Sequence, residues 1–430
     1  MLTNKGSLFG NILWLLADKA YGSLLVLGFL ALFARQYGPE VFGIWNYIVA
    51  FGALVPALGS LGLNFLIVQY LKEKPALKDA ILAHALLLRF LFSLGFVLIL
   101  GLGYYALGIN GEYIWVALTY FLSQLVLTAN VAIYENESKL ENQKTVIARN
   151  IAFTLGFIAR LIAIGRGEEL LIYALISLAE MSLFFLLLGR KSDLFSALKG
   201  TRFSGRLSKI LVTRGMPLFL SAITVILYLR IDQVFIGHFM DNQSVGIYAS
   251  ASRITEMFYA LPVIITNVFF PKVIEAKRNK EDFKKSLAKM YGVVLWLSLL
   301  ICLGIILVSD HLVVWLYGPE FIESAEILRM YAWSLLFMGI LVSGSKFILT
   351  ISANELIFKR DVLGLVSNVV LNVVLIPQFG LKGAAMATLI SYFISAYLSN
   401  IFFKKLRPLL VEIPMGMISI LSLVKRRGIN

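Results

Sequence analysis

Twelve long apolar stretches run through this chain, and the loops between them alternate between basic and nearly uncharged. A bilayer core about 30 Å thick is crossed by a helix of roughly 20 apolar residues. With 59% hydrophobic residues and a mean hydropathy of +0.84, the chain has too little polar surface to cover a water-soluble globule. The sequence therefore predicts an all-α integral membrane protein with about twelve transmembrane helices, near residues 7–34, 41–71, 78–107, 112–134, 146–165, 168–189, 211–237, 244–271, 286–309, 322–350, 356–376 and 381–403.

The basic residues of the loops gather on one side of these predicted spans. That side carries 29 Lys and Arg residues, whereas the opposite side carries only Arg35, Arg166 and Lys382. Short cytoplasmic loops of membrane proteins hold an excess of Lys and Arg. We therefore expect the basic side, with both the N- and C-termini, to be cytoplasmic, and the number of spans to be even.

The same topology accounts for the net charge of +14. Basic loops contact anionic lipid headgroups, so no nucleic-acid partner is expected. A single cysteine, Cys302, permits no intrachain disulfide, and three scattered histidines form no metal cluster, so neither a metal nor a cofactor is predicted. The first apolar segment is too long for a signal-peptide core and is expected to be retained.

Enzymatic chemistry finds little room in this sequence. The longest predicted external loop is that around Ser309–Ile322, and the inner loops are too short for a nucleotide-binding domain. No GxSxG, HExxH or GxxxxGK[ST] motif is present. We therefore predict no catalytic residues and expect the protein to work across the bilayer, as a transporter rather than an enzyme.

The chain also contains signs of an internal duplication. Gly43-Ile44-Trp45 matches Gly246-Ile247-Tyr248 at a separation of 203 residues, and Pro56 and Pro262 follow in the two matching spans. Proline bends a transmembrane helix, so these two are candidate gating kinks. The predicted architecture is two six-helix halves around a central cavity, with halves at 1–189 and 211–403, a basic linker at 190–210 and a basic, partly apolar tail at 404–430, whose apolar patch 409–424 is expected at the interface rather than as a thirteenth span.

Ionisable side chains inside the spans mark the candidate site. Each costs roughly 3 kcal/mol on insertion scales if left facing lipid, so most must face water, protein or one another. The basic ones outnumber the acidic ones, and guanidinium groups bind phosphate oxygens well, which favours an anionic cargo. The candidate cavity residues are Arg89, Arg230, Arg253, Arg160 and Lys346, although snorkelling remains open for Arg160 and Lys346; Asp18, Glu180, Asp232 and Glu256 are candidates for ion coupling or structural pairing.

Several segments resemble those of Wzx-type polysaccharide flippases of the multidrug/oligosaccharidyl-lipid/polysaccharide (MOP) exporter superfamily. They include RIDQVFIGHFMDNQSVGIYASASRI from Arg230, WLYGPEFIESAEILRM from Trp315 and SNVVLNVVLIPQFGLKGAAMATLISYF from Ser367. The resemblance covers nearly the whole chain. It implies translocation of undecaprenyl-pyrophosphate-linked repeat units of O-antigen, capsule or exopolysaccharide to the outer leaflet of the cell inner (cytoplasmic) membrane, with membrane lipids around it and a polymerase or chain-length complex as a candidate partner.

Two other functions stay open. One is an ion-coupled, MATE-like exporter of small molecules, for which an interior rich in arginine is a poor match. The other is a membrane enzyme of glycan assembly, for which a residue such as Asp310 or His311 in a short external loop would have to be catalytic.

Overall fold

The computed structural model describes the backbone of residues 5–106, 111–128, 130–139, 141–190, 192–201, 203–278 and 283–427. Within these ranges the side chains are described except at residues 5–20, 65, 106, 111, 195, 200, 217, 218, 221, 222, 278 and 419–427. The described parts consist of helices and short connections, with no strand among them. The predicted all-α class is therefore confirmed.

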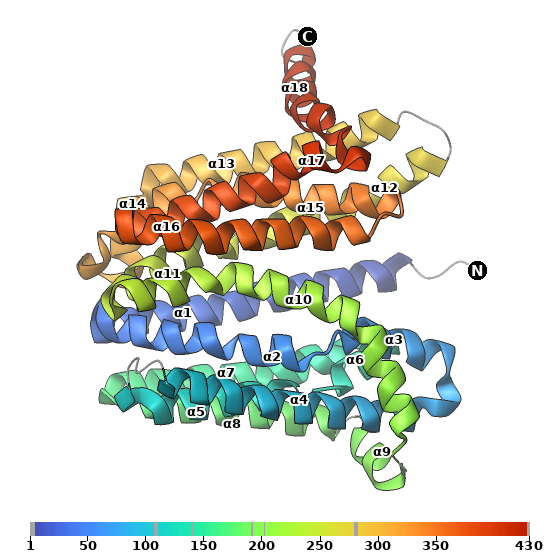
Figure 1. Cartoon of the computed structure of the whole chain (residues 1–430), viewed down its shortest axis with the longest axis vertical. Helices are drawn as coiled ribbons and strands as arrows, with labels where there is room; N and C mark the ends of the chain where they lie inside the picture. The colour runs from blue at the N-terminus through green and yellow to red at the C-terminus, as the bar shows by residue number, and fades with distance from the viewer. Residues whose placement is uncertain are drawn as a thin grey trace. The chain divides into compact units, whose positions relative to one another are not determined.

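Long helices follow one another along the chain (Figure 1). The first half contains α1 (Lys5–Gly52), α2 (Leu54–Gly59), α3 (Leu63–Glu73), α4 (Lys78–Ala106), α5 (Ile114–Thr128), α6 (Ala132–Ser138), α7 (Asn142–Arg166), α8 (Leu170–Gly189), α9 (Leu194–Gly200) and α10 (Gly205–Phe239). The second half contains α11 (Asn242–Met257), α12 (Ala260–Arg278), α13 (Phe283–Tyr317), α14 (Ser324–Tyr331), α15 (Ser334–Thr350), α16 (Glu355–Phe393), a π-helical turn (Ile394–Leu398), α17 (Ser399–Phe402) and α18 (Leu409–Arg427).

Nine helical stretches among the described residues are long and apolar enough to cross a membrane. Two of them, Tyr21–Gly59 and Glu355–Phe402, each cover parts of two predicted spans. In both, a glycine with positive φ interrupts the helix: Gly38 with φ 74° and Gly380 with φ 57°. Glycine adopts such angles at little cost, so each is a point where one span can end and the next begin. The protein is a multi-pass membrane protein; the count of twelve and the cytoplasmic termini stay predictions.

Both predicted kink prolines follow a break in a helix. α1 ends at Gly52, and α2, which contains Pro56, begins two residues later. Similarly, α11 ends at Met257 and Pro262 lies in the first turn of α12. Proline fits the first turn of a helix because no intrahelical partner is lost there. Whether these breaks act as gates stays a prediction.

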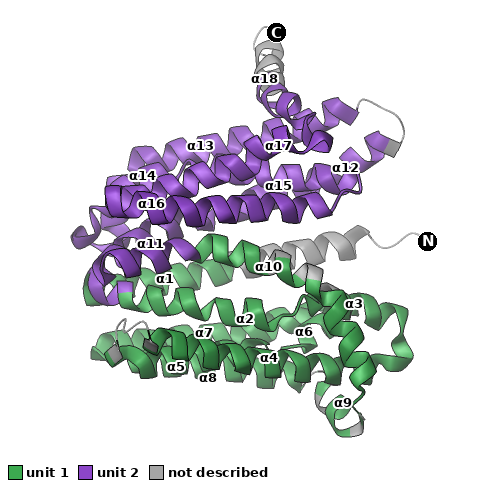
Figure 2. Ribbon diagram, viewed as in Figure 1, with its two compact units in different colours: residues 1–38, 44–230 green, residues 39–43, 231–430 purple. Residues whose placement is uncertain are grey.

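The chain divides into two compact units, coloured green and purple in Figure 2. Unit 1 comprises Met1–Gly38 and Ile44–Arg230, and unit 2 comprises Pro39–Gly43 and Ile231–Asn430. The division between the units falls inside α10. The predicted halves, 1–189 and 211–403, follow the membrane spans rather than these contacts, so their boundaries stay predictions.

Each unit has its own apolar core. In unit 1 the core includes Leu63, Ile67 and Leu82, with Leu194 and Ala197 of α9 packed into it. In unit 2 the core includes Leu287, Met290 and Ile348, and α18 packs against α13, where an added Cβ at Gly416 would lie 2.6 Å from the Ala288 carbonyl oxygen. The predicted tail segment is thus helical and bound to unit 2, and α18 is not among the nine candidate spans.

A reciprocal close contact within unit 2 joins the two segments that match in sequence. A Cβ added at Gly43 would lie 1.7 Å from the Asn242 carbonyl oxygen, and one added at Gly246 would lie 2.0 Å from the Pro39 carbonyl oxygen. Both Pro39 and Asn242, and Gly43 and Gly246, are separated by 203 residues. The two backbones approach so closely that only glycine fits at these two positions.

Candidate functional site

A buried carboxylate in unit 2 is surrounded by neutral polar groups. Asp232, on α10, is 3% exposed and accepts hydrogen bonds from Asn372 Nδ2 at 2.6 Å and from the Tyr248 hydroxyl at 2.7 Å. The Thr388 hydroxyl also donates to this carboxylate. Asn372 and Thr388 lie on the two parts of α16, on either side of Gly380. We call Asp232, Tyr248, Asn368, Asn372 and Thr388 the Asp232 cage.

The cage contains more oxygen atoms than its hydrogen bonds satisfy. Asn372 Nδ2 also donates to Asn368 Oδ1 at 3.1 Å, while Asn372 Oδ1 is buried without a hydrogen-bond partner. Within the part of the chain that the structure describes, no Lys or Arg forms an ion pair with Asp232. A buried carboxylate without a cation is costly, so the cage is suited to a mobile cation that oxygen ligands can hold.

Unit 1 contains a buried carboxylate of the opposite kind, which has a fixed partner. Glu180 on α8 pairs with Arg160 Nη1 on α7 at 2.6 Å, and both side chains are largely buried. The guanidinium of Arg160 also lies 5.1 Å from the centre of the Phe29 ring. Neither residue is exposed as a lipid-facing charge would be. The pair is internally neutral, in contrast to the Asp232 cage.

An aromatic cluster packs beside Arg160 in unit 1. Phe29, Phe33, Trp45 and Tyr173 have ring centres 5.0–6.5 Å apart in successive pairs. The hydroxyl of Tyr37 donates to the Glu168 carbonyl at 2.6 Å and lies 2.9 Å from the Tyr173 hydroxyl. Offset and edge-to-face contacts of this kind stabilise aromatic clusters.

Arg89 is buried in unit 1 and bonded to neutral groups. Its Nε donates to the Thr128 carbonyl at 2.8 Å and its Nη1 to Asn64 Oδ1 at 2.7 Å, and its guanidinium lies 5.3 Å from the centre of the Tyr134 ring. Thr128 is the last residue of α5. Because the C-terminal carbonyls of a helix lack intrahelical donors and carry partial negative charge, Arg89 is well placed to cap α5.

The other predicted cations and acids occupy separate places. Arg253 and Glu256, three residues apart on α11, form an ion pair at 3.5 Å and are largely buried. The Lys346 ammonium on α15 lies 4.8 Å from the centre of the Phe270 ring, and no carboxylate pairs with it among the described residues. Arg230 is partly buried on α10, where unit 1 ends. Asp18 lies outside the described side chains.

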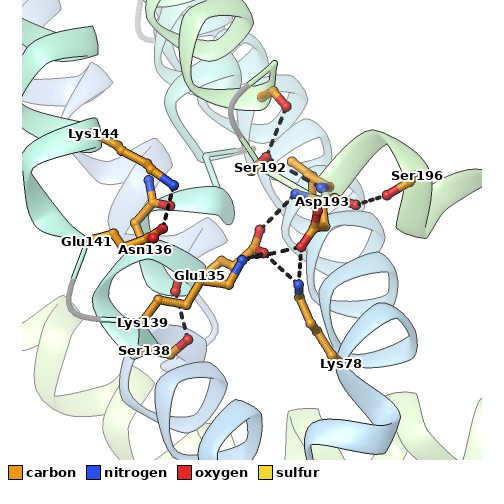
Figure 3. Close-up of polar contacts among 12 residues, drawn as sticks. Lys78, Glu135, Asn136, Ser138, Lys139, Glu141, Lys144, Ser192, Asp193 and Ser196 are labelled. Carbon is orange, nitrogen blue, oxygen red and sulfur yellow. Dashed lines mark hydrogen bonds and ion pairs between the residues drawn. The ribbon is translucent and has the colours of Figure 1, made fainter.

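A four-residue ion cluster ties together three segments at the predicted cytoplasmic side of unit 1 (Figure 3). Glu135 on α6 is fully buried, and its Oε1 lies 2.9 Å from Lys78 Nζ and 2.7 Å from Lys139 Nζ. Both ammonium groups also pair with Asp193, which precedes α9. The Asp193 backbone N–H donates to Glu135 Oε2 at 3.2 Å. We call Lys78, Glu135, Lys139 and Asp193 the Glu135 cluster.

The Glu135 cluster sets the charge state of Asp193. The Lys78 ammonium, with help from Glu135 and Lys139, holds the pKa of the Asp193 carboxyl well below its usual range. Hydrogen bonds to an ionised carboxylate and nearby cations both favour the charged form. Asp193 is therefore ionised at neutral pH, and it anchors the start of α9.

Sequence reasoning missed the partners that complete these sites. Asn368 and Asn372 stand four residues apart in an apolar span, which places both on one helix face; this spacing was the available signal for the cage. Glu135, just after the predicted span 112–134, gave no comparable signal. Asp310, the suggested catalytic candidate, forms an ion pair with Arg329, whose Nε also donates to Ser309 Oγ at 2.8 Å.

Among the described residues, no three His, Cys, Asp or Glu side chains gather closely enough to hold a metal ion. The Asp232 cage differs from such clusters because a single carboxylate is joined by amide and hydroxyl groups.

Solved structures identify the class of fold. The chain resembles the lipid II flippase MurJ in an inward closed conformation, with a TM-score of 0.71 and 17% identity over 96% of this chain and 93% of that one. It also resembles an inward-facing multidrug resistance MATE transporter of the MOP superfamily, with a TM-score of 0.64 and 18% identity over 93% and 96% of the two chains. The chain therefore shares the all-helical fold of these two solved structures.

Sequence comparisons then give the family. Residues 32–326 match the family model described as "Polysaccharide biosynthesis protein", and the chain belongs to this family. A relative from Haloferax volcanii, "Probable low-salt glycan biosynthesis flippase Agl15", is 24% identical over 86% of this chain and 78% of its own length. "Capsular polysaccharide biosynthesis protein CapF" of Staphylococcus aureus is 24% identical over 44% of this chain and 49% of its own. The predicted class, a transporter rather than an enzyme, agrees with the names of these relatives and solved structures.

Proposed function

We propose that this protein moves lipid-linked oligosaccharides across the membrane. The observation that carries the proposal is membership of the polysaccharide biosynthesis protein family on a MOP transporter fold. The relative named "Probable low-salt glycan biosynthesis flippase Agl15" supports it further. The finer proposal is that the cargo is an undecaprenyl-pyrophosphate-linked repeat unit of O-antigen, capsule or exopolysaccharide, carried from the cytoplasmic to the outer leaflet of the inner membrane.

The mechanism we propose is alternating access without covalent chemistry. We propose that the anionic head leaves water beside the cationic candidates Arg89, Arg160, Arg230, Arg253 and Lys346, since guanidinium and ammonium groups pair with phosphate oxygens. Glu180 and Glu256 already offset the charges of Arg160 and Arg253, so these two would contribute hydrogen bonds rather than net charge. Lys346 is the sharpest test of this idea because no carboxylate among the described residues competes for its charge. Pro56 and Pro262 mark the helices proposed to act as gates.

A coupling cation at the Asp232 cage is proposed to drive transport. The cage holds a carboxylate, two amides and two hydroxyl groups, with Asn372 Oδ1 unpartnered. A proton or a sodium ion would neutralise Asp232 and satisfy the free oxygen. Glu180 and Glu256 already have arginine partners, so we propose structural pairing for these two. Asp18 stays a candidate for coupling on its position in the sequence.

The decisive experiment measures the sidedness of polyprenyl-linked glycan in cells depleted of this protein. Accumulation on the cytoplasmic leaflet, with surface glycan lost and restored by the intact gene, is the expected result. A normal leaflet distribution in cells without a second exporter would overturn the proposal. It would favour instead the small-molecule exporter suggested by the MATE-like fold, which a drug-sensitivity assay then tests.

A second experiment addresses the cargo's charge through Lys346. The Lys346→Gln variant should transport the glycan at least about tenfold more slowly, because one ion pair with phosphate in a site shielded from water contributes more than 1.4 kcal/mol. Lys359→Gln, at an exposed position on α16, is the matched control and should transport normally. Equal rates in both variants would remove Lys346 from the transport path.

A further inference from the structure

An apolar cavity of about 440 Å³ lies in unit 1, apart from the sites described above. Side chains of α4, α5, α8 and α9 line it, together with Phe203 just after α9. Its volume falls within the range of small-molecule pockets. The apolar side chains that line it include Leu87, Phe90, Phe185, Leu186, Leu198 and Phe203.

The segment that closes one side of this cavity is held at both ends. At its start, Asp193 is bound by the Glu135 cluster. At its end, the Ser204 backbone N–H donates to His84 Nε2 at 2.7 Å, and the His84 and Phe203 rings lie 5.1 Å apart. Between these anchors, α9 packs against α4 (Figure 1). The cavity is therefore a defined feature of unit 1, since its wall is fixed by polar contacts on both sides.

The mouth of the cavity opens among apolar side chains. Leu87, Phe90, Leu186 and Phe203 are 37%, 42%, 48% and 52% exposed. Three of them belong to α4 and α8, which are candidate membrane spans, so their surroundings are hydrocarbon rather than water. Apolar cavities exclude water, so a hydrocarbon chain from the bilayer is the occupant that fits.

Basic residues adjoin the lining residues in the sequence. Lys199 follows the lining residue Leu198 on α9 and is exposed, as is Ser196. Between Arg190 and Arg214 the chain carries seven Lys and Arg residues. Basic groups next to the ends of transmembrane helices attract anionic lipid headgroups.

We propose that this cavity binds an acyl chain of an anionic phospholipid from the same leaflet, with the headgroup beside Lys199. The site is independent of the Asp232 cage and of the glycan cargo. The bound lipid fills the space between α4, α8 and α9, and it makes the stability of unit 1 depend on the phospholipid composition of the membrane.

Native mass spectrometry of the full-length protein in detergent tests this site. With added dioleoylphosphatidylglycerol, we expect one tightly retained lipid per chain. Leu186→Trp, which places an indole in the mouth, should weaken its retention by about tenfold, since losing the burial of two methylene groups suffices for that. Leu155→Trp is the matched control: Leu155 on α7 is 52% exposed and does not line the cavity, so retention should be unchanged.

Two further measurements separate the lipid classes. Lys199→Gln should lower retention of phosphatidylglycerol by about fivefold and leave that of phosphatidylcholine unchanged, because one basic residue near anionic lipid contributes about 1 kcal/mol. Equal retention in wild type and Leu186→Trp would overturn the site. Displacement of phosphatidylglycerol by a lower concentration of polyprenyl phosphate would overturn the phospholipid assignment and make the cavity a place for the tail of the proposed cargo.

Discussion

Phe29 in unit 1 and Asp232 in unit 2 are separated by 203 residues, as are Trp45 and Tyr248. In unit 1 the Phe29 ring contacts Trp45, Tyr173 on α8 and Arg160 on α7. In unit 2 the Asp232 carboxylate contacts Tyr248 and residues on the two parts of α16. Positions matched by this separation therefore hold an aromatic ring in unit 1 and a carboxylate in unit 2.

The two positions differ in how charge is balanced. In unit 1 the Arg160 guanidinium beside Phe29 pairs with Glu180 at 2.6 Å. In unit 2 Asp232 meets amide and hydroxyl groups and has no ion-pair partner among the described residues. A carboxylate paired with an arginine has its charge balanced by the protein itself. A buried carboxylate without such a partner depends on a cation or proton from solution to balance its charge. The predicted duplication would give two similar scaffolds, and we expect ion dependence in unit 2 alone.

The largest expected effect comes from breaking the fixed pair in unit 1. Glu180→Gln leaves the Arg160 guanidinium buried without an anion, which typically costs about 3–5 kcal/mol. We expect a clearly lower melting temperature in detergent, measured by differential scanning fluorimetry. Removing both charges, in Arg160→Met with Glu180→Gln, should restore most of the stability. A double variant as unstable as Glu180→Gln would show that packing, rather than charge, holds α7 to α8.

The opposite outcome is expected in unit 2. Asp232→Asn removes a buried charge that has no fixed partner, so stability should be maintained or improved. Transport should nevertheless fall about tenfold or more if a cation at the Asp232 cage drives it, an effect of about 1.4 kcal/mol or more. The measurement is glycan transport at fixed protein level, with Thr224→Ala on the same helix as the control, since Thr224 donates only to the Leu220 carbonyl.

The ion itself is identified from stability. Sodium binding to the folded protein raises its melting temperature, so wild type should be more stable in sodium than in potassium chloride, and Asp232→Asn should not. If sodium has no effect and transport follows the external pH, a proton occupies the cage. Transport by Asp232→Asn at the wild-type rate would remove the coupling role altogether.

Local patterns explain what the sequence could predict. Hydropathy over about 20 residues depends on neighbours in the chain, so the all-α membrane fold and the positions of its long helices were predictable. The pairing of Arg253 with Glu256 was predictable for the same reason, since the two are three residues apart on one helix.

The partners across helices were not predictable in this way. Arg160 and Glu180 are 20 residues apart on different helices, and Asp232 meets Asn372 and Thr388 from far along the chain. Such contacts depend on how the helices pack, and the spacing of residues along one sequence does not reveal that packing. Arg89 is a further example: nothing near it in the chain predicts that its Nε donates to the Thr128 carbonyl at the end of α5.

Where the two repeats are alike, substitutions should have equal effects. Gly43→Ala and Gly246→Ala each place a methyl group against a backbone carbonyl, at 1.7 Å and 2.0 Å respectively. Overpacking of this kind costs about 1–3 kcal/mol. We expect both variants to lower the melting temperature by similar amounts, while Gly304→Ala, with open space around its added Cβ, should not. Unequal decreases in melting temperature for the two variants would show that the two segments match in sequence but not in how tightly they pack.

The smallest effect is expected at the Glu135 cluster, which has no counterpart in the comparison of Phe29 with Asp232. Because the pKa of Asp193 is held below its usual range, its charge adds stability that is fully present above the unfolded pKa of about 3.9 and is lost as the pH falls further. Between pH 5 and 8 the anchoring of α9 should therefore be constant. Asp193→Asn should loosen it at every pH in that range, by well under 1 kcal/mol because the site is exposed.

Hydrogen–deuterium exchange of residues 192–204 measures this anchoring. Faster exchange in Asp193→Asn, with the core of unit 1 unchanged, is the expected result. Lys144→Gln, which breaks the separate exposed pair with Glu141, is the control and should leave α9 protected. If the protection factors of these amides already fall between pH 8 and 5 in wild type, a group other than Asp193 controls the anchoring by its titration. Asp193 would then be a surface contact without a role in holding α9.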